Sequence, residues 1–240
     1  MVFADLDDTL FQTAWKMSEP VVDTRLASRA KNGIHSYMTK AQAATVDWLL
    51  KTTRLIPTTA RGSRVLARTT IPFTDYKICA NGGAILTPEG AHDPHWAARV
   101  AKISRQYNDA FDGLQDAVSV LADSGVLRSW LVYEAQIPVY FVAKIGTGTS
   151  QAVLDEAEAR CRKAVGGDLV FHRNERNMSF TPGGLTKLDA VREMLGRLPN
   201  TDKRPIWGMG DSVSDLSFMR LCQMMAIPSN SQITKNRLEA

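Results

Sequence analysis

Three carboxylates follow directly on an apolar run at the start of the chain. The run Met1–Ala4 precedes Asp5, and Asp7 and Asp8 come directly after Leu6. Continuous hydrophobicity predicts a short buried strand, and residues two apart in extended backbone point the same way. Two carboxylates aimed at one spot repel each other unless one is protonated or a cation lies between them. Oxygen ligands suit a hard cation such as Mg²⁺. An acidic turn after a strand is the plainer alternative, because Asp and Thr are common in turns.

Polar side chains also stand at the ends of other predicted strands. These are Thr59 in the segment 55–62, Asn81 after residues 76–80, and Asp211 after residues 204–210. Parallel strands bring their carboxyl ends to one edge of a sheet, where ligands bind. Phosphoryl transfer needs a positioned nucleophile, a cation and hydrogen-bond donors to the phosphoryl oxygens. The convergence of these residue types therefore favours phosphoryl transfer.

Four stretches together resemble the motifs of the haloacid dehalogenase-like (HAD) superfamily, in the order in which that family has them. They are Asp-Leu-Asp-Asp-Thr-Leu at 5–10, Pro-Thr-Thr-Ala-Arg at 57–61, Gly-Gly-Leu-Thr-Lys-Leu at 183–188, and Gly-Asp-Ser-Val-Ser-Asp at 210–215. The sequence Asn-Gly-Gly-Ala at 81–84 resembles the subgroup whose cap domain is inserted between the second and third motifs. That subgroup includes sucrose-phosphate phosphatase-like and Cof-like sugar phosphatases, and phosphomannomutases. The resemblance covers residues 1–84 and 182–228, and the cap matches only in its position and pattern.

The resemblance implies roles for the first acids. Asp5 would be the nucleophile that forms an aspartyl-phosphate. Asp7 would be the general acid for the leaving alkoxide and later the base for water, and its backbone carbonyl would ligate Mg²⁺. Asp8 has no matching catalytic role and is expected to support its neighbours or shape the turn.

The second and third motifs would supply hydrogen bonds and a positive charge. Thr59 would donate to a phosphoryl oxygen, although Thr58 competes for this role and Ala60 stands where the family often has Gly. Lys187 would hold the phosphoryl group and restrain the nucleophile, although Leu188 departs from the Gly of many relatives. An ordinary strand threonine and a solvated helix lysine are the alternatives.

The fourth motif would complete the metal site. Asp211 and Asp215 lie one helical turn apart and can share a face. The resemblance implies that Asp211 ligates Mg²⁺ and that Asp215 lies in its surroundings or beside the motif lysine, so both join Asp5 and Asp7 as candidate metal ligands. Acidic residues that merely stabilise a helix N-terminus are the alternative.

Three further residues, Arg61, Asn81 and Gly82, are candidate substrate-binding residues because they stand beside these motifs. In the insert, Glu134, Lys144, His172, Arg173 and Arg176 could contact a substrate, but ordinary surface charge explains them equally well.

Strands alternate with helices at both ends of the chain, over residues 1–84 and 182–240. This alternation predicts an α/β fold with a Rossmann-like parallel-sheet core and helices on both faces. The pattern changes over residues 85–181, which we expect to form an inserted α+β cap domain that selects the substrate. We expect glycine hinges at 82–83 and 182–184.

Several local elements follow from the pattern. The Asn-Gly pair at 32–33 predicts a hairpin flap, and Thr39 is a plausible N-cap for a helix over 39–51. Residues 12–20 are expected to be irregular. The insert should contain two helices over 96–122 with a break near residues 112–113, an antiparallel strand pair over 126–145, a helix over 151–164, and short strands over 168–173 and 178–181. The tail over 229–240 is either a terminal helix or a frayed end.

Composition narrows the class of protein. The chain has 240 residues, of which 44% are hydrophobic and 22% charged, as in an ordinary globular protein. The net charge of +4 is spread along the chain, so no nucleic-acid module is indicated. No apolar run is long enough to cross a membrane and no signal peptide is evident. Three scattered cysteines, with no Cys-x-x-Cys, favour reduced thiols in the cytoplasm.

These observations favour a Mg²⁺-dependent phosphatase that hydrolyses a small phosphomonoester, and a sugar phosphate is the expected substrate. A phosphomutase of the same fold and a non-catalytic metabolite-binding relative are the alternatives. The partner is expected to be a small phosphorylated metabolite, neither nucleic acid nor a membrane. The sequence does not indicate an oligomeric state.

Overall fold

The structure is a computed structural model that describes residues 1–17, 20–174, 176–199, 201 and 203–238. The chain forms two compact units, one of residues Met1–Asp93 with Lys187–Ala240 and one of residues Pro94–Thr186. Each unit is described by itself below.

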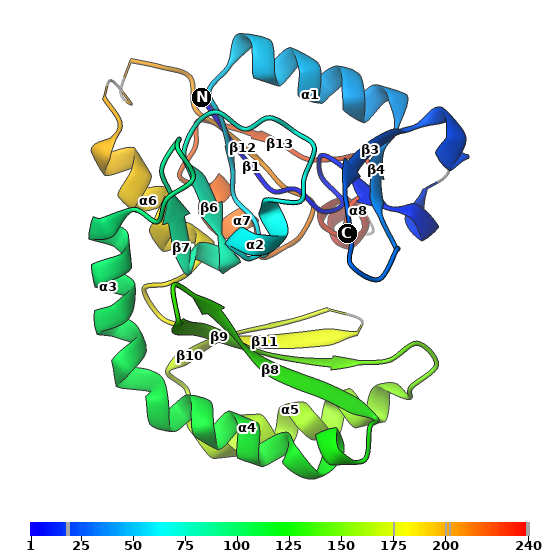
Figure 1. Cartoon of the computed structure of the whole chain (residues 1–240), viewed down its shortest axis with the longest axis vertical. Helices are drawn as coiled ribbons and strands as arrows, with labels where there is room; N and C mark the ends of the chain where they lie inside the picture. Colours follow the sequence, from blue (N-terminus) through cyan, green and yellow to red (C-terminus); the bar gives the residue numbers. More distant parts are fainter. Residues whose placement is uncertain (18–19, 175, 200, 202, 239–240) are drawn as a thin grey trace. The chain divides into compact units, whose positions relative to one another are not determined.

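The first unit is built on a parallel sheet in the order β13-β12-β1-β5, shown in Figure 1. The bounds of these strands are Met224–Ala226, Trp207–Met209, Val2–Ala4 and Leu55–Pro57. A parallel bridge between Thr58 and Ile78 links the end of β5 to β6 (Lys77–Cys79), which pairs antiparallel with β7 (Ala84–Leu86). The predicted α/β core with a parallel sheet is confirmed.

The chain runs outward from β1 in one direction to β5 and later in the other direction to β12. Because crossovers between parallel strands are right-handed, this reversal places the connecting helices on opposite faces. Figure 1 shows α1 (Lys40–Thr52) on one side of the sheet and α7 (Leu216–Met219) on the other. The remaining helices of the unit are α2 (Ser63–Leu66), α6 (Lys187–Arg197) and α8 (Gln232–Leu238), and the 3₁₀ turns are Ala14–Lys16, Val21–Asp23 and Ala80–Gly82.

Local sequence signals account for several of these elements. Thr39 caps α1 as predicted, since its side chain accepts from the backbone N–H of Gln42 while the Gln42 side chain accepts from the backbone N–H of Thr39. The strands of the central sheet are three residues each, and β1 and β5 are wholly buried, which explains their uninterrupted apolar sequence.

A small antiparallel sheet in the order β2-β4-β3 forms the flap. Its strands are Gln12–Thr13, Ser36–Met38 and Arg25–Ser28. The predicted hairpin around residues 32–33 is confirmed, and Gly33 has the positive φ of +78° that a side chain would disfavour. The expectation that residues 12–20 are irregular was wrong where they are described, because β2 and the turn Ala14–Lys16 lie there.

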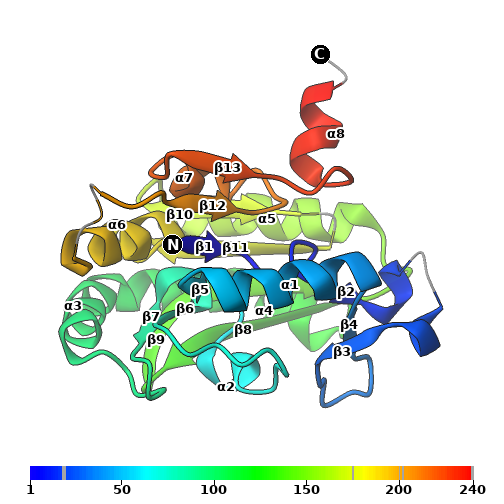
Figure 2. The same cartoon turned by 90° about the horizontal axis from the view of Figure 1, so that it is seen from above.

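The C-terminal tail forms α8, which extends away from the central sheet in Figure 2. The backbone N–H of Ile233 donates to the backbone carbonyl of Asp211 at 3.0 Å, so the start of this helix is tied to the fourth motif. Residues 239–240 of the predicted tail lie outside the described residues.

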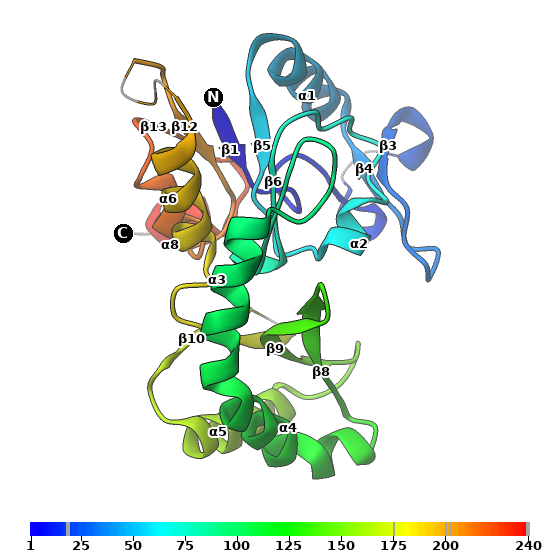
Figure 3. The same ribbon diagram turned by 60° about the vertical axis from the view of Figure 1, so that its left-hand side comes forward.

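The second unit is an antiparallel sheet in the order β10-β11-β9-β8, with α4 and α5 packed on one face (Figure 3). The strands are Leu169–Arg173, Asn177–Pro182, Ile137–Ile145 and Leu127–Glu134, and the helices are α3 (Pro94–Ser104), α4 (Asn108–Asp123) and α5 (Gln151–Val165). The predicted strand pair over 126–145 is confirmed, with a turn at Ala135 and Gln136, which both have positive φ.

Two details of the insert differ from expectation. The break between its first two helices is a 3₁₀ turn at Arg105–Tyr107, whereas Asp112 and Gly113 lie inside α4. A lone glycine is tolerated inside a helix, so Gly113 was a poor sign of a break. Strand β7 also groups with the first unit, because it pairs with β6.

Among the described residues, no helix has both the length and the apolar character needed to cross a membrane.

Candidate active site

The centre of the candidate site is a buried lysine between two buried carboxylates. The ammonium nitrogen of Lys187 donates to Asp5 Oδ1 and to Asp215 Oδ1, each at 2.7 Å. All three residues are at least nine-tenths buried, and Asp215 is wholly inaccessible to solvent. Charges with so little access to water persist only where they pair and hydrogen-bond with one another. The structure therefore brings the first, third and fourth motifs together.

Backbone geometry positions each of these side chains. Asp5 follows β1, and its backbone N–H donates to the carbonyl of Met209 at the end of β12. Lys187 is the first residue of α6. Asp215 immediately precedes α7, and its Oδ2 accepts from the backbone N–H and the hydroxyl of Ser212 at 3.2 and 2.8 Å.

Gly210 makes room for Asp215. A Cβ atom at Gly210 would lie 2.5 Å from the Cβ of Asp215 and 2.9 Å from its carboxyl carbon, closer than real contacts of this kind. The glycine that opens the fourth motif is thus a steric requirement of this site.

Burial and mutual charge shift the pKa values of the ionisable groups. Burial raises the pKa of Asp5 to about 8, more than the neighbouring Lys187 ammonium lowers it. Burial raises the pKa of Asp211 to about 6, and the charge of Asp215 adds to this. For Lys187, burial disfavours the ammonium, but the carboxylates of Asp215 and Asp5 more than offset this, and its pKa lies above the ordinary range.

A candidate metal site lies within the same cluster. Carboxylate oxygens of Asp5, Asp211 and Asp215 all lie within 4.8 Å of one another. The hydroxyl of Thr9 lies 3.4 Å from Asp5 Oδ2 and 3.4 Å from Asp211 Oδ1, so it joins the two acids. Burial is the main cause of the raised pKa values of Asp5 and Asp211, and an oxygen-ligated Mg²⁺ would favour the ionised form of both carboxylates. These residues fit such an ion.

The side chain of Asp7 lies outside this carboxylate cluster and pairs with Arg61. Arg61 Nε donates to Asp7 Oδ2 and Nη2 donates to Asp7 Oδ1, both at 2.7 Å. This leaves the backbone carbonyl as the candidate metal-ligating atom of Asp7. Asp8 has a positive φ of 61° and pairs with Lys16, which agrees with the turn role expected for it.

The loops after β5 and β6 are tied together beside these residues. The Thr59 hydroxyl accepts from the backbone N–H of Arg61 at 3.0 Å, and the Thr59 carbonyl accepts from the backbone N–H of Asn81 at 3.0 Å. The Thr58 hydroxyl instead donates to the backbone carbonyl of Ile56 at 3.4 Å. Asn81 and Gly82 both have positive φ, so the turn that holds them is tightly specified.

Sequence reasoning missed the polar residues that support the acids. Thr9 lay within the first motif and could have been suspected from its place four residues after Asp5. Ser212 lay within the fourth motif. Ser28 and Ser36, which bind Arg61, come from the flap and carry no sequence signal.

Two cationic side chains of the second unit differ in their surroundings. Arg173 pairs with Asp155 and Glu158, so ion pairs within the unit account for its charge. Lys144 instead stands directly opposite Arg128 across the β8–β9 pair. Burial lowers the pKa of Lys144, and the charges of Arg176 and Arg128 lower it further.

Comparison with known proteins supports the fold. No family model matches the sequence, and no match is found among curated proteins. Solved structures do match. The sucrose-phosphatase of Synechocystis sp. PCC6803, solved with sucrose and phosphate, is 16% identical with a TM-score of 0.56, covering 99% of this chain and 85% of that one. A sugar phosphatase of HAD subclass IIB is 12% identical with a TM-score of 0.58, covering 98% and 90%. A haloacid dehalogenase-like hydrolase from B. subtilis is 14% identical with a TM-score of 0.54, covering 98% and 92%. The fold suspected from the motifs is thereby confirmed.

Proposed function

We propose that this chain, which has the haloacid dehalogenase-like fold, is a Mg²⁺-dependent phosphatase that hydrolyses a small phosphomonoester, most specifically a sugar phosphate. The observation that carries the proposal is the buried Lys187 between Asp5 and Asp215, beside Asp211. A buried charge network of this kind stabilises a fold poorly compared with apolar packing, which favours a functional reason for it.

Asp5, Asp211 and the backbone carbonyl of Asp7 would hold Mg²⁺, and Asp215 would support them. When bound, the ion neutralises charge on the phosphoryl oxygens and on the clustered carboxylates. Lys187 and the Thr59 hydroxyl would bind the remaining phosphoryl oxygens.

The proposed chemistry has two steps. Asp5 Oδ attacks phosphorus in line, the bond to the ester oxygen breaks, and Asp7 gives that oxygen a proton. Water then attacks the aspartyl-phosphate while Asp7 takes its proton, which releases inorganic phosphate and restores Asp5. Dividing the reaction in this way replaces one difficult displacement by two easier ones.

Residues 94–186 would act as the cap that selects the substrate, in place of the predicted 85–181, because β7 groups with the first unit. A cap that closes excludes bulk water and admits only small substrates.

The test is release of inorganic phosphate from a panel of phosphorylated metabolites, with and without Mg²⁺. We expect release only with the divalent cation, and loss of on the order of 10³-fold or more in Asp5→Asn protein, which lacks the nucleophile. Asp8→Asn is the matched control, since it removes an adjacent carboxylate that pairs with Lys16 on the surface. Full activity in Asp5→Asn protein would rule out the proposed nucleophile.

A phosphomutase is the second candidate function. Its substrate would carry a second phosphate, which cationic side chains of the cap would have to bind. Arg128 and Lys144 face each other across two strands, and Arg176 lies close enough to lower the pKa of Lys144. Like charges placed opposite each other destabilise a sheet, so an anionic ligand would relieve them. The discriminating measurement is conversion of hexose 1-phosphate to hexose 6-phosphate without release of phosphate.

A further inference from the structure

The guanidinium group of Arg61 contacts several side chains at once. Besides its two bonds to Asp7, its Nη1 donates to the Ser28 hydroxyl at 2.6 Å and its Nη2 to the Ser36 hydroxyl at 3.3 Å. The guanidinium also lies over the Phe11 ring, 4.8 Å from its centroid. Its side chain is 14% exposed. The donors of Arg61 are thus committed to protein groups, which leaves little capacity to bind a substrate as first expected.

The partners of Arg61 come from separate parts of the first unit. Asp7 and Phe11 lie on the loop after β1, Ser28 ends β3 and Ser36 begins β4. Both serines are buried. A planar guanidinium with five N–H donors in fixed directions can hold several groups in one geometry, which lysine cannot do. Arg61 therefore joins the loop that carries Asp7 to the base of the flap.

We propose that Arg61 is a positioning residue for proton transfer, which holds the Asp7 carboxylate at the leaving-group oxygen and is itself held by Ser28 and Ser36. This rests on the proposed function. Two parallel N–H···O bonds fix both the place and the plane of the Asp7 carboxylate. In the transfer step Asp7 starts protonated on one oxygen, which points to the leaving group, while its other oxygen keeps one bond from Arg61. The proton passes to the departing alkoxide, and the ionised Asp7 then accepts both bonds from Arg61 as seen in the structure.

The inference makes a specific kinetic claim. A general acid matters most when the leaving group is a poor one, such as an alkoxide, and least when it is stabilised, such as p-nitrophenolate. Loss of Arg61 should therefore harm alkyl phosphates far more than p-nitrophenyl phosphate. A merely structural role would harm all esters alike.

The experiment measures kcat/KM for Arg61→Met and Arg61→Lys proteins against p-nitrophenyl phosphate, phenyl phosphate and an alkyl phosphate that the wild type hydrolyses. The ratio kcat/KM reports the steps up to formation of the phosphoenzyme, so the later hydrolysis does not mask the effect. We expect a loss on the order of 10²-fold for the alkyl ester and under about threefold for the p-nitrophenyl ester. Ser28→Ala should show the same trend with a smaller loss.

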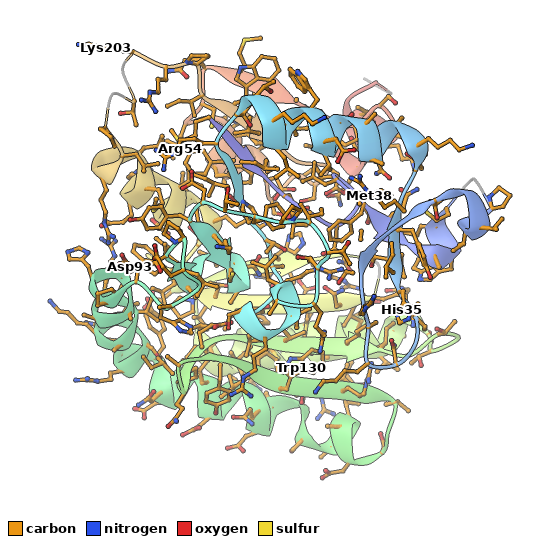
Figure 4. The ribbon with its side chains drawn as sticks, turned by 45° about the horizontal axis from the view of Figure 1, so that its top comes forward. His35, Met38, Arg54, Asp93, Trp130 and Lys203 are labelled. Carbon is orange, nitrogen blue, oxygen red and sulfur yellow. The ribbon has the colours of Figure 1, made fainter. Side chains whose placement is uncertain are left out.

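Arg54→Met is the matched control. Arg54, labelled in Figure 4, forms a second two-bonded pair with an aspartate in the same unit, since its Nε and Nη2 donate to Asp75 at 2.6 and 2.9 Å. It precedes β5, at the end of the strand opposite to Thr59. Its loss should change kcat/KM for all three esters by one common factor.

The double variant Arg61→Met/Asp7→Asn distinguishes the mechanisms further. If Arg61 acts through Asp7, the double variant should be no slower on the alkyl ester than Asp7→Asn alone. Equal losses on all esters in Arg61→Met and Arg61→Lys protein that is folded by circular dichroism, or multiplied losses in the double variant, would overturn the inference. Should Arg61→Met not fold, Arg61→Lys and Ser28→Ala decide on the same criterion. A wild type inactive on every ester would instead refute the proposed function.

Discussion

The charge network around Lys187 in the first unit differs in burial from the ion pairs on α5 of the second unit. In the first unit, Lys187 and its two carboxylates are buried together. In the second unit, ion pairs such as Arg160–Glu156 and Arg162–Glu158 lie on the solvent side of α5, one helical turn apart. Exposed pairs of this kind contribute little to stability, whereas a buried network depends on every member being present. The difference indicates that the charges around Lys187 depend on one another, whereas the ion pairs on α5 do not.

Packing around glycine shows a parallel contrast. In the first unit, Gly208 and Gly210 have no space for a side chain, because a Cβ would lie 2.8 Å from the Cα of Met219 and 2.5 Å from the Cβ of Asp215. In the second unit, a Cβ at Gly113 would meet only a carbonyl oxygen of Ala164, at 3.9 Å. The backbone at Gly208 and Gly210 thus approaches its neighbours more closely than the backbone of α4 does at Gly113.

The largest effect should come from Lys187→Met, which leaves two buried carboxylates without their cation. We expect the free energy of unfolding to fall by about 3–5 kcal/mol, as when one partner of a buried pair is removed. Urea unfolding followed by circular dichroism measures this. Arg160→Met, which removes an exposed pair, should change it by under about 0.5 kcal/mol. Equal costs for the two variants would contradict the contrast between the units.

The glycine contrast predicts opposite signs for one substitution. Gly210→Ala should destabilise the protein by about 1–3 kcal/mol, because Asp215 must move away from an added methyl group. Gly113→Ala should stabilise it by about 0.5–1 kcal/mol, because alanine is the better helix former and the space is open. Thermal unfolding of the two variants side by side tests both signs. A stabilising Gly210→Ala would show that Asp215 is not confined as described.

The smallest effect is a pH dependence of stabilisation by Mg²⁺. The pKa of Asp211 rises from the ordinary 3.8 to about 6. Without the cation, its contribution to stability is therefore fully present below pH 3.8 and is lost as the pH rises through 6. Mg²⁺ binds the ionised form, so the increase in Tm that it causes should grow from pH 5 to pH 7.5. Protonation of Asp211 alone makes the apparent affinity about tenfold weaker at the lower pH, or about 1.4 kcal/mol, and protonation of Asp5, whose pKa is about 8, weakens it further.

The control for this titration is Asp211→Asn protein. It should lose most of the Mg²⁺-induced rise in Tm at every pH in this range. A rise that is as large at pH 5 as at pH 7.5 in the wild type would contradict the assignment of this acid to the metal site.

Much of the fold could be predicted because its signals are local. The apolar run before Asp5, the N-cap at Thr39 and the Asn-Gly turn at 32–33 each depend on neighbouring residues, and each formed as expected. The helix break at Arg105–Tyr107 did not follow from local sequence, since these residues are ordinary helix formers. The exposed Trp130 on β8, labelled in Figure 4, likewise shows that side-chain type alone does not decide burial.

The sequence by itself determined the motifs, their order and the buried strands, because spacing along the chain and apolar runs act over a few residues. Only the tertiary structure decided that Arg61 binds Asp7 and two flap serines, and that Thr9 joins Asp5 to Asp211. Such pairings join residues far apart in the chain, or depend on side-chain directions that the turn after β1 sets. No local pattern encodes them, because they depend on how the loops after separate strands meet.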